Sequence, residues 1–258
     1  MKAIILFYFL AFSISWIVWW PMALSGVKTY TYLFISQSLG ALGPLLSLFI
    51  LNQLYKEKRL VKTVFDRIQV RREYVRWFIL SALFPIALAV FTSLVRYAAG
   101  DLSELHIMQP EHTENLGRAL IIIVPIQFSA SLITSPLFEE PAWRGFVVST
   151  LYQKRGKLFT SILVGTLWWV WHIPIYVTYS NSLTILSFMG LLGYSFILDA
   201  FFILSGRNLL VAMLFHQGMN TAIVFFNPGT DTLLGIVVLW IFVILIRAWW
   251  QIESRNKE

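Results

Sequence analysis

Few side chains able to carry acid–base chemistry lie inside the long apolar stretches of this 258-residue sequence. An ionisable group in such a stretch is costly unless it is paired or hydrated, so its presence points to a function. The sequence has no cysteine, which excludes disulfides, a thiol nucleophile and cysteine metal ligands. The candidate residues in these stretches are Glu139, Glu140, Arg144, His172, Asp199, His216 and Asn220.

The two adjacent glutamates have different neighbours on a helix. Glu140 faces Arg144, four residues later, at the spacing of an ion pair. Glu139 points about 100° away and is therefore predicted to be the reactive carboxylate. A carboxylate beside an imidazole is suited to take a proton from water.

A second pair of polar residues, His216 and Asn220, is also four residues apart and shares one helix face. Both side chains can donate hydrogen bonds to a negative oxygen that develops on a carbonyl group. The alternative is that they hold helices together through hydrogen bonds, which is a common role for polar residues in membrane helices.

The elements that position these residues are transmembrane helices. Hydrophobic residues make up 58% of the chain and charged residues only 13%, which excludes a soluble domain of this size. The sequence therefore predicts an all-α polytopic transmembrane helical bundle, a single integral-membrane domain over residues 1–258 with about eight crossings. The predicted spans are 3–24, which is read as a retained anchor, 31–54, 77–98, 118–153, 158–179, 182–205, 208–227 and 232–249.

Charge predicts the orientation of these spans, because Lys and Arg near helix ends favour the cytoplasmic side. Segment 56–76 is strongly basic, whereas segment 100–117 carries four acidic residues and no Lys or Arg. The basic residues at 154–157, Arg207 and the C-terminal tail then fall on the same side as 56–76. We expect a multi-pass cell-membrane protein with both termini in the cytoplasm. Segment 56–76 is predicted to be an interfacial helix that attracts anionic lipid headgroups rather than nucleic acid.

The fourth predicted span is too long for one straight crossing, and Pro125, Pro136 and Pro141 give places where it can break. Depth along the helices brings the polar residues together. Glu139 and His172 each lie roughly 22 Å from the basic residues at 154–157, and His216 lies roughly 14 Å beyond Arg207. Three helices thus place their polar side chains in one layer, which predicts a single site.

Three motifs over residues 118–226 resemble those of the CPBP family of intramembrane proteases, which includes CAAX-processing and Abi-like bacteriocin-linked members. EEPAWR at 139–144 matches the family's EExxxR, and HQGMN at 216–220 matches HxxxN. WWVWH at 168–172 is similar to the aromatic-xxx-His motif, with Trp168 where the family usually carries Phe. Residues 1–117 add only hydrophobic spans, so the resemblance assigns the catalytic core to 118–226.

The resemblance implies an endopeptidase that hydrolyses a peptide bond of a membrane-associated or lipidated substrate. Glu139 and His172 would activate water, and His216 and Asn220 would hold the oxyanion, with Glu140, Arg144 and Trp168 in support. No cofactor is favoured. Zinc is the alternative, with Glu139, His172 and His216 as its ligands. The implied partners are a peptide or protein substrate and the lipid bilayer, and no nucleic acid.

Other functions are compatible with parts of this pattern. A non-catalytic immunity or scaffold protein would keep the same fold and bind peptides without cutting them, and a transporter would also carry intramembrane charges. His172, read alone among tryptophans, fits an interfacial aromatic belt. Asp199 has no motif partner, and His106 and His112 lie in the acidic segment, so none of these three is assigned a role.

Overall fold

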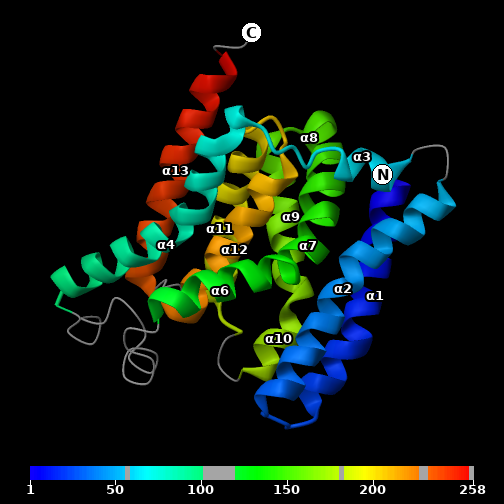
Figure 1. The fold of residues 1–258 in the computed structure, drawn as a ribbon, viewed down its shortest axis with the longest axis horizontal. Coiled ribbons are helices and arrows are strands. Elements are labelled where there is room, and N and C mark those ends of the chain that lie inside the picture. The colour runs from blue at the N-terminus through cyan, green and yellow to red at the C-terminus, as the bar shows by residue number, and fades with distance from the viewer. Residues whose placement is uncertain (56–58, 101–119, 180–182, 227–231, 256–258) are drawn as a thin grey trace.

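The computed structural model describes residues 1–55, 59–100, 120–179, 183–226 and 232–255, and these residues form a helical bundle (Figure 1). The all-α prediction is therefore confirmed for the described part of the chain. Helices α1 (Lys2–Leu24) and α2 (Tyr30–Leu54) form an antiparallel hairpin. They pack closely because Gly40 of α2 leaves space for the Trp19 indole, and the hydroxyl of Ser15 donates to the Gly40 carbonyl at 2.7 Å.

A second group of helices forms the other side of the bundle. Its members are α4 (Val75–Ala98), α11 (Ile185–Leu204), α12 (Leu209–Phe225) and α13 (Leu233–Arg255). Helix α12 packs along α4, and a Cβ atom on Gly218 would clash with the backbone carbonyl of Ala82. The glycine thus allows two backbones to approach, which fixes the position of the helix that carries His216.

The fourth predicted span is broken into pieces, as its length and prolines indicate. The pieces are α6 (Leu120–Leu132), α7 (Ser135–Glu140), the π-helix η5 (Pro141–Val148) and α8 (Ser149–Arg155). Pro125 lies inside α6 without ending it, so the first break falls later, at Ile133 and Thr134. In Figure 1, α6 runs across the neighbouring helices rather than along them.

The fifth predicted span, 158–179, is also interrupted. Helix α9 (Lys157–Trp171) ends at His172, and α10 (Ile173–Thr178) begins directly after it with Pro174 near its start. Backbone N–H groups in the first turn of a helix have no acceptor within that helix. A proline there therefore loses no hydrogen bond, and Pro174 permits a new helix to begin. His172 therefore lies at the joint between two helices.

The predicted count of eight crossings is not confirmed. Within the described residues, five helices are long and apolar enough to cross a membrane, at 2–24, 30–54, 72–98, 185–204 and 233–251, and 209–225 is a shorter apolar helix. The spans predicted at 118–153 and 158–179 fall short because prolines divide them. The protein thus has several membrane-spanning helices and fewer continuous ones than periodicity and length suggest.

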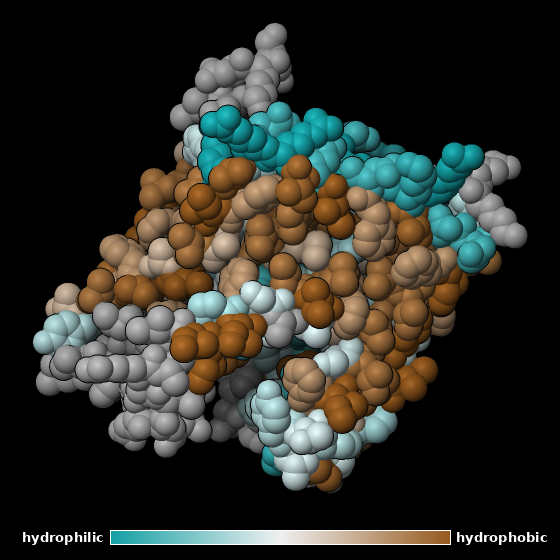
Figure 2. All heavy atoms as spheres, in the orientation of Figure 1, coloured by the Kyte–Doolittle hydropathy of each residue, from teal (hydrophilic) through white to brown (hydrophobic). Residues whose placement is uncertain are grey.

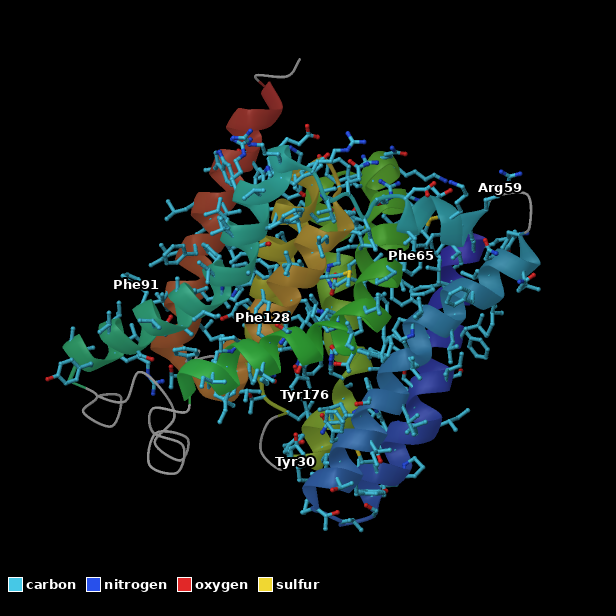
Figure 3. All side chains as sticks on the ribbon, in the orientation of Figure 1. Tyr30, Arg59, Phe65, Phe91, Phe128 and Tyr176 are labelled. Atoms are coloured by element: carbon cyan, nitrogen blue, oxygen red, sulfur yellow. The ribbon has the colours of Figure 1, made fainter. Side chains whose placement is uncertain are left out.

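Segment 56–76 is not the single interfacial helix that was predicted. Its described residues form a short helix α3 (Leu60–Phe65) and a 3₁₀ turn η2 (Arg72–Tyr74), followed by the start of α4. The N-terminus, α3, α8 and the end of α13 lie at one end of the bundle (Figure 1). Figure 3 shows Arg59 and Phe65 at this end and Tyr30 and Tyr176 at the other. The predicted acidic segment 100–117 lies almost wholly outside the described residues.

Candidate active site

Glu139 and Glu140 are the last two residues of α7, directly before the π-helix η5. Pro141 has no backbone N–H to donate and disturbs the preceding turn, and π-helical turns of this kind are frequent at functional sites. Both carboxyl groups are buried, with exposed fractions of 2% for Glu139 and 0% for Glu140. Buried carboxyl groups require partners, and the two glutamates have different ones.

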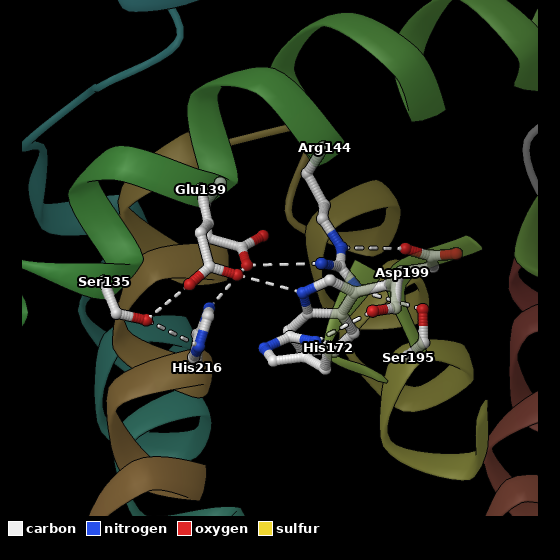
Figure 4. Close-up of polar contacts among 9 residues, drawn as sticks. Ser135, Glu139, Arg144, His172, Ser195, Asp199 and His216 are labelled. Carbon is white, nitrogen blue, oxygen red and sulfur yellow. Dashed lines mark hydrogen bonds and ion pairs between the residues drawn. The ribbon is translucent and has the colours of Figure 1, made fainter. Parts of the chain in front are cut away.

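Arg144 is the centre of a buried ionic cluster (Figure 4). Its Nη1 donates to Glu140 Oε1 at 3.2 Å, which confirms the predicted pair, and its Nε donates to Asp199 Oδ1 at 3.2 Å. Its Nη2 donates to Ser195 Oγ at 2.9 Å, and its guanidinium lies 4.6 Å from the Trp168 ring centroid. Arg144 thus joins η5 to α9 and α11 while it balances two carboxyl groups.

His216 contacts both glutamates, one directly and one through a serine. Its Nδ1 lies 2.6 Å from Glu140 Oε1, and its Nε2 lies 3.3 Å from Ser135 Oγ. Ser135 donates its proton to Glu139 Oε1 at 2.7 Å, so its oxygen is left to accept from the imidazole. The sequence spacing did not predict this bridge between α7 and α12.

Trp168 is the aromatic centre of the site. Its Nε1 donates to Glu139 Oε2 at 2.9 Å, and its ring centroid lies 5.6 Å from that of His172 and 5.3 Å from that of His216. A phenylalanine at this position would supply a ring but no donor. The departure from the family's usual residue therefore adds a hydrogen bond to Glu139.

His172 is oriented by the end of α9. Its Nδ1 lies 2.8 Å from the Trp168 carbonyl oxygen, and because a carbonyl only accepts, Nδ1 carries the proton. Nε2 is then the unprotonated nitrogen, able to accept a proton from water. The ring centroids of Trp171 and Trp19 lie 4.7 and 6.0 Å from that of His172, and they hold it against the aromatic core.

The structure thus gathers Glu139, His172 and His216 around Trp168, as helix depth predicts. Asn220 is half-buried on α12, one turn beyond His216. Asp199, which was left without a role, is 1% exposed and pairs with Arg144. Its presence as an acid inside an apolar span was a signal of such a partner, although the partner itself depends on tertiary packing.

Two serines of the site were missed. Ser135 precedes Glu139 by four residues, and Ser195 precedes Asp199 by four, so each shares a helix face with an acid. Serine is common in membrane helices, and only the spacing relative to an in-span acid singles these two out.

Zinc would require Glu139, His172 and His216 to converge as ligands. Among the residues that the structure describes, no three His, Asp or Glu side chains form a group able to hold a metal ion. This arrangement does not fit the zinc alternative.

Comparison with known proteins identifies the region that carries this site. The family model for Rce1-like type II CAAX prenyl endopeptidases matches residues 121–222, which fall within the predicted core. CAAX prenyl protease 2 of Methanococcus maripaludis is 28% identical over 107 residues. That alignment covers 38% of this chain and 39% of the relative, so it spans well under half of either protein. The resemblance drawn from the three motifs is confirmed.

Proposed function

We propose that this chain, which belongs through residues 121–222 to the Rce1-like family of type II CAAX prenyl endopeptidases, is an intramembrane endopeptidase. The observation that carries the proposal is the unequal environment of the two glutamates. Glu140 lies against two basic side chains, Arg144 and His216. Among the residues that the structure describes, Glu139 accepts hydrogen bonds from the neutral donors Ser135 and Trp168. Glu140 is thus held in ion pairs, whereas Glu139 is bound by neutral groups only weakly tied to its charge, so Glu139 is assigned the proton transfer.

The first step is the activation of water. Glu139 and the unprotonated Nε2 of His172 flank the Trp168 ring, and a water molecule between them would give up its proton to Glu139. The resulting hydroxide forms a bond to the carbonyl carbon of the scissile peptide, and the carbonyl oxygen takes the negative charge. The proton held by Glu139 then passes to the leaving amine as the C–N bond breaks, which restores the carboxylate.

The oxyanion of this intermediate would accept hydrogen bonds from His216 and Asn220. For His216 to turn its Nε2 proton from Ser135 to the oxyanion while Nδ1 donates to Glu140, both nitrogens must be protonated. The surroundings of the ring offer an acceptor to each of these N–H groups, Glu140 Oε1 at 2.6 Å from Nδ1 and Ser135 Oγ at 3.3 Å from Nε2. Glu140 then holds the imidazolium in place.

The proposed mechanism needs no metal ion, because Glu139 and His172 are assigned the activation of water. Peptide cleavage that persists in a strong chelator, by protein without stoichiometric zinc, is the expected result. Loss of cleavage on zinc removal and its return with added zinc would overturn this part of the proposal.

The proposed substrate is a membrane-associated or lipidated peptide or protein. The Methanococcus maripaludis relative is a CAAX prenyl protease by name, which makes prenylated CAAX proteins one such class. A non-catalytic protein that binds peptides with the same fold is the competing function, and substitution of the proposed base separates the two.

The test compares membrane and secreted peptides from cells that contain the wild-type protein, Glu139→Gln or no protein. We expect wild-type cells to contain cleaved peptides that are missing from the other two strains, as measured by mass spectrometry. Equal amounts of Glu139→Gln and wild-type protein in the membrane are the control for folding. A cleavage pattern in Glu139→Gln cells identical to that of wild-type cells would contradict the proposed chemistry.

A further inference from the structure

A second polar site lies at the end of the bundle that carries α3 and α8, away from the glutamates. It is a pocket of about 200 Å³ with three basic side chains in its wall. We call it the basic pocket, and its cations are Arg67, Lys154 and Arg207. They come from three separate segments, namely the turn after α3, the end of α8 and the connection between α11 and α12. Cations from distant parts of a chain repel one another, so their convergence needs an explanation.

The backbone holds two of these segments together. The Arg67 carbonyl accepts a hydrogen bond from the Leu209 amide at 2.9 Å, and Asn208 Nδ2 donates to the Gln69 carbonyl at 2.7 Å. Arg207 has a left-handed backbone with φ of 66°, which is costly for a residue with a side chain. The chain thus fixes Arg67 and Arg207 side by side rather than letting them separate.

The basic pocket offers donors and positive charge without a matching acceptor. Among the described residues that line it there is no Asp or Glu, and Arg67 Nε is buried with no hydrogen-bond partner. Burial and the nearby Arg207 guanidinium lower the pKa of Arg67. The hydroxyl protons of Ser149 and Thr150 already go to backbone carbonyls. A ligand of this pocket must therefore accept hydrogen bonds from cations, which is the chemistry of an oxyanion.

The place of the basic pocket in the molecule indicates the source of that oxyanion. Hydrophilic residues form a band over α3 and the start of α4, directly above a belt of hydrophobic residues (Figure 2). The belt is where acyl chains would lie, and the band is at the level of phospholipid headgroups. Guanidinium groups form paired hydrogen bonds with phosphate oxygens.

We propose that the basic pocket binds the phosphate group of an anionic phospholipid. The lining of the pocket includes Gly145, which directly follows Arg144 in η5, and Ser149, the first residue of α8. Val64 of α3 packs against Gly145 so closely that a Cβ atom there would meet its side chain. A bound phosphate would therefore hold α3 and α12 against the segment that carries the ionic cluster and would stabilise the folded chain.

The test measures the unfolding temperature of the full-length protein in detergent at fixed ionic strength, with added dihexanoyl phosphatidylglycerol. We expect this lipid to raise the unfolding temperature, and Arg67→Gln or Arg207→Gln to require about tenfold more lipid for the same rise. Lys154→Gln, an exposed position of the same pocket, provides a further variant if either arginine substitution lowers the yield. Arg72→Gln is the matched control, because Arg72 is exposed in the same basic segment and does not line the pocket.

Several results would overturn the proposal. An equal rise with dihexanoyl phosphatidylcholine would show that the phosphate is not recognised by charge. An equal rise with inorganic phosphate at the same concentration would identify a site for a free anion rather than for a lipid. If Arg72→Gln raised the required lipid concentration as much as Arg67→Gln does, the lipid would be attracted by the basic surface in general and not bound in the pocket.

Discussion

At the scale of single residues, the site depends on how neighbouring acids are divided between partners. Glu140 and Asp199 both bond to Arg144, and Glu140 also contacts His216. These groups are almost fully buried, so none of the charges is compensated by bulk water. Removing one member of the cluster therefore leaves the others buried without a charged partner.

Glu140→Gln should therefore destabilise the folded protein, by about 3–5 kcal/mol, because Arg144 and His216 lose the negative charge that they share. Arg144→Met added to it would leave Asp199 without its partner. The triple variant with Asp199→Asn, which removes the charges of the Arg144 pairs together, should be more stable than Glu140→Gln alone. Thermal unfolding in nanodiscs measures both effects. A Glu140→Gln protein as stable as wild type would show that the pair is dispensable.

Trp168→Phe keeps the ring and removes the N–H that bonds to Glu139. A hydrogen bond to a charged group contributes about 1.5–3 kcal/mol, so we expect cleavage to fall roughly tenfold or more with the fold retained. Trp169→Phe is the control, because its indole N–H bonds to Ser187, away from the glutamates. Equal cleavage rates for wild type and Trp168→Phe would show that the hydrogen bond from Trp168 to Glu139 does not contribute to cleavage.

Residue spacing predicts local pairs better than tertiary ones. The four-residue step from Glu140 to Arg144 was enough to predict their contact, since both lie on one turn of helix. The contacts of Arg144 with Asp199 and of His216 with Ser135 join different elements. They depend on helix rotation and crossing, which single-sequence periodicity does not determine.

At the scale of elements, the site is built where helices are interrupted. Glu139 and Glu140 precede a π-helix that starts at Pro141, and His172 separates α9 from α10. Interrupted backbone inside a membrane must be buried in protein or line a wet cavity. The prolines of the fourth span indicated where it can break, whereas 158–179 was predicted as one span and Pro174 in it was not considered.

Helix α12 carries His216 and must keep its distance from α4. Gly218→Ala would push the added methyl group against the Ala82 carbonyl, and a backbone cannot rotate away as a side chain can. We expect a loss of about 1–3 kcal/mol in stability and lower cleavage per folded molecule, because His216 moves with the helix. Ile223→Ala, on the exposed face of α12, should change neither. Unfolding and cleavage assays on both variants check this.

At the scale of the whole molecule, hydrophobic composition predicts a multi-pass helical protein but overestimates the number of continuous spanning helices. Composition measures how apolar a segment is, whereas a crossing also needs an unbroken helix of sufficient length. The absence of cysteine from the sequence makes the orientation accessible to experiment.

The basic end of the bundle is predicted to face the cytoplasm, because Lys and Arg near helix ends favour that side. Lys62→Cys, at this end, should therefore resist a membrane-impermeant thiol reagent in intact cells. Val27→Cys, in the exposed turn between α1 and α2 at the other end, should react. Labelling of Lys62→Cys but not of Val27→Cys would show that the protein has the opposite orientation in the membrane.

The central claim is that Glu139 is the base of a peptide hydrolase, and cleavage by purified protein tests it most directly. Wild type, Glu139→Gln and Glu140→Gln in nanodiscs are given a peptide identified from the cellular comparison, and product is counted per folded molecule. We expect no product from Glu139→Gln at near wild-type stability, since glutamine keeps the shape but cannot accept the proton. Cleavage by Glu139→Gln at close to the wild-type rate would contradict the account.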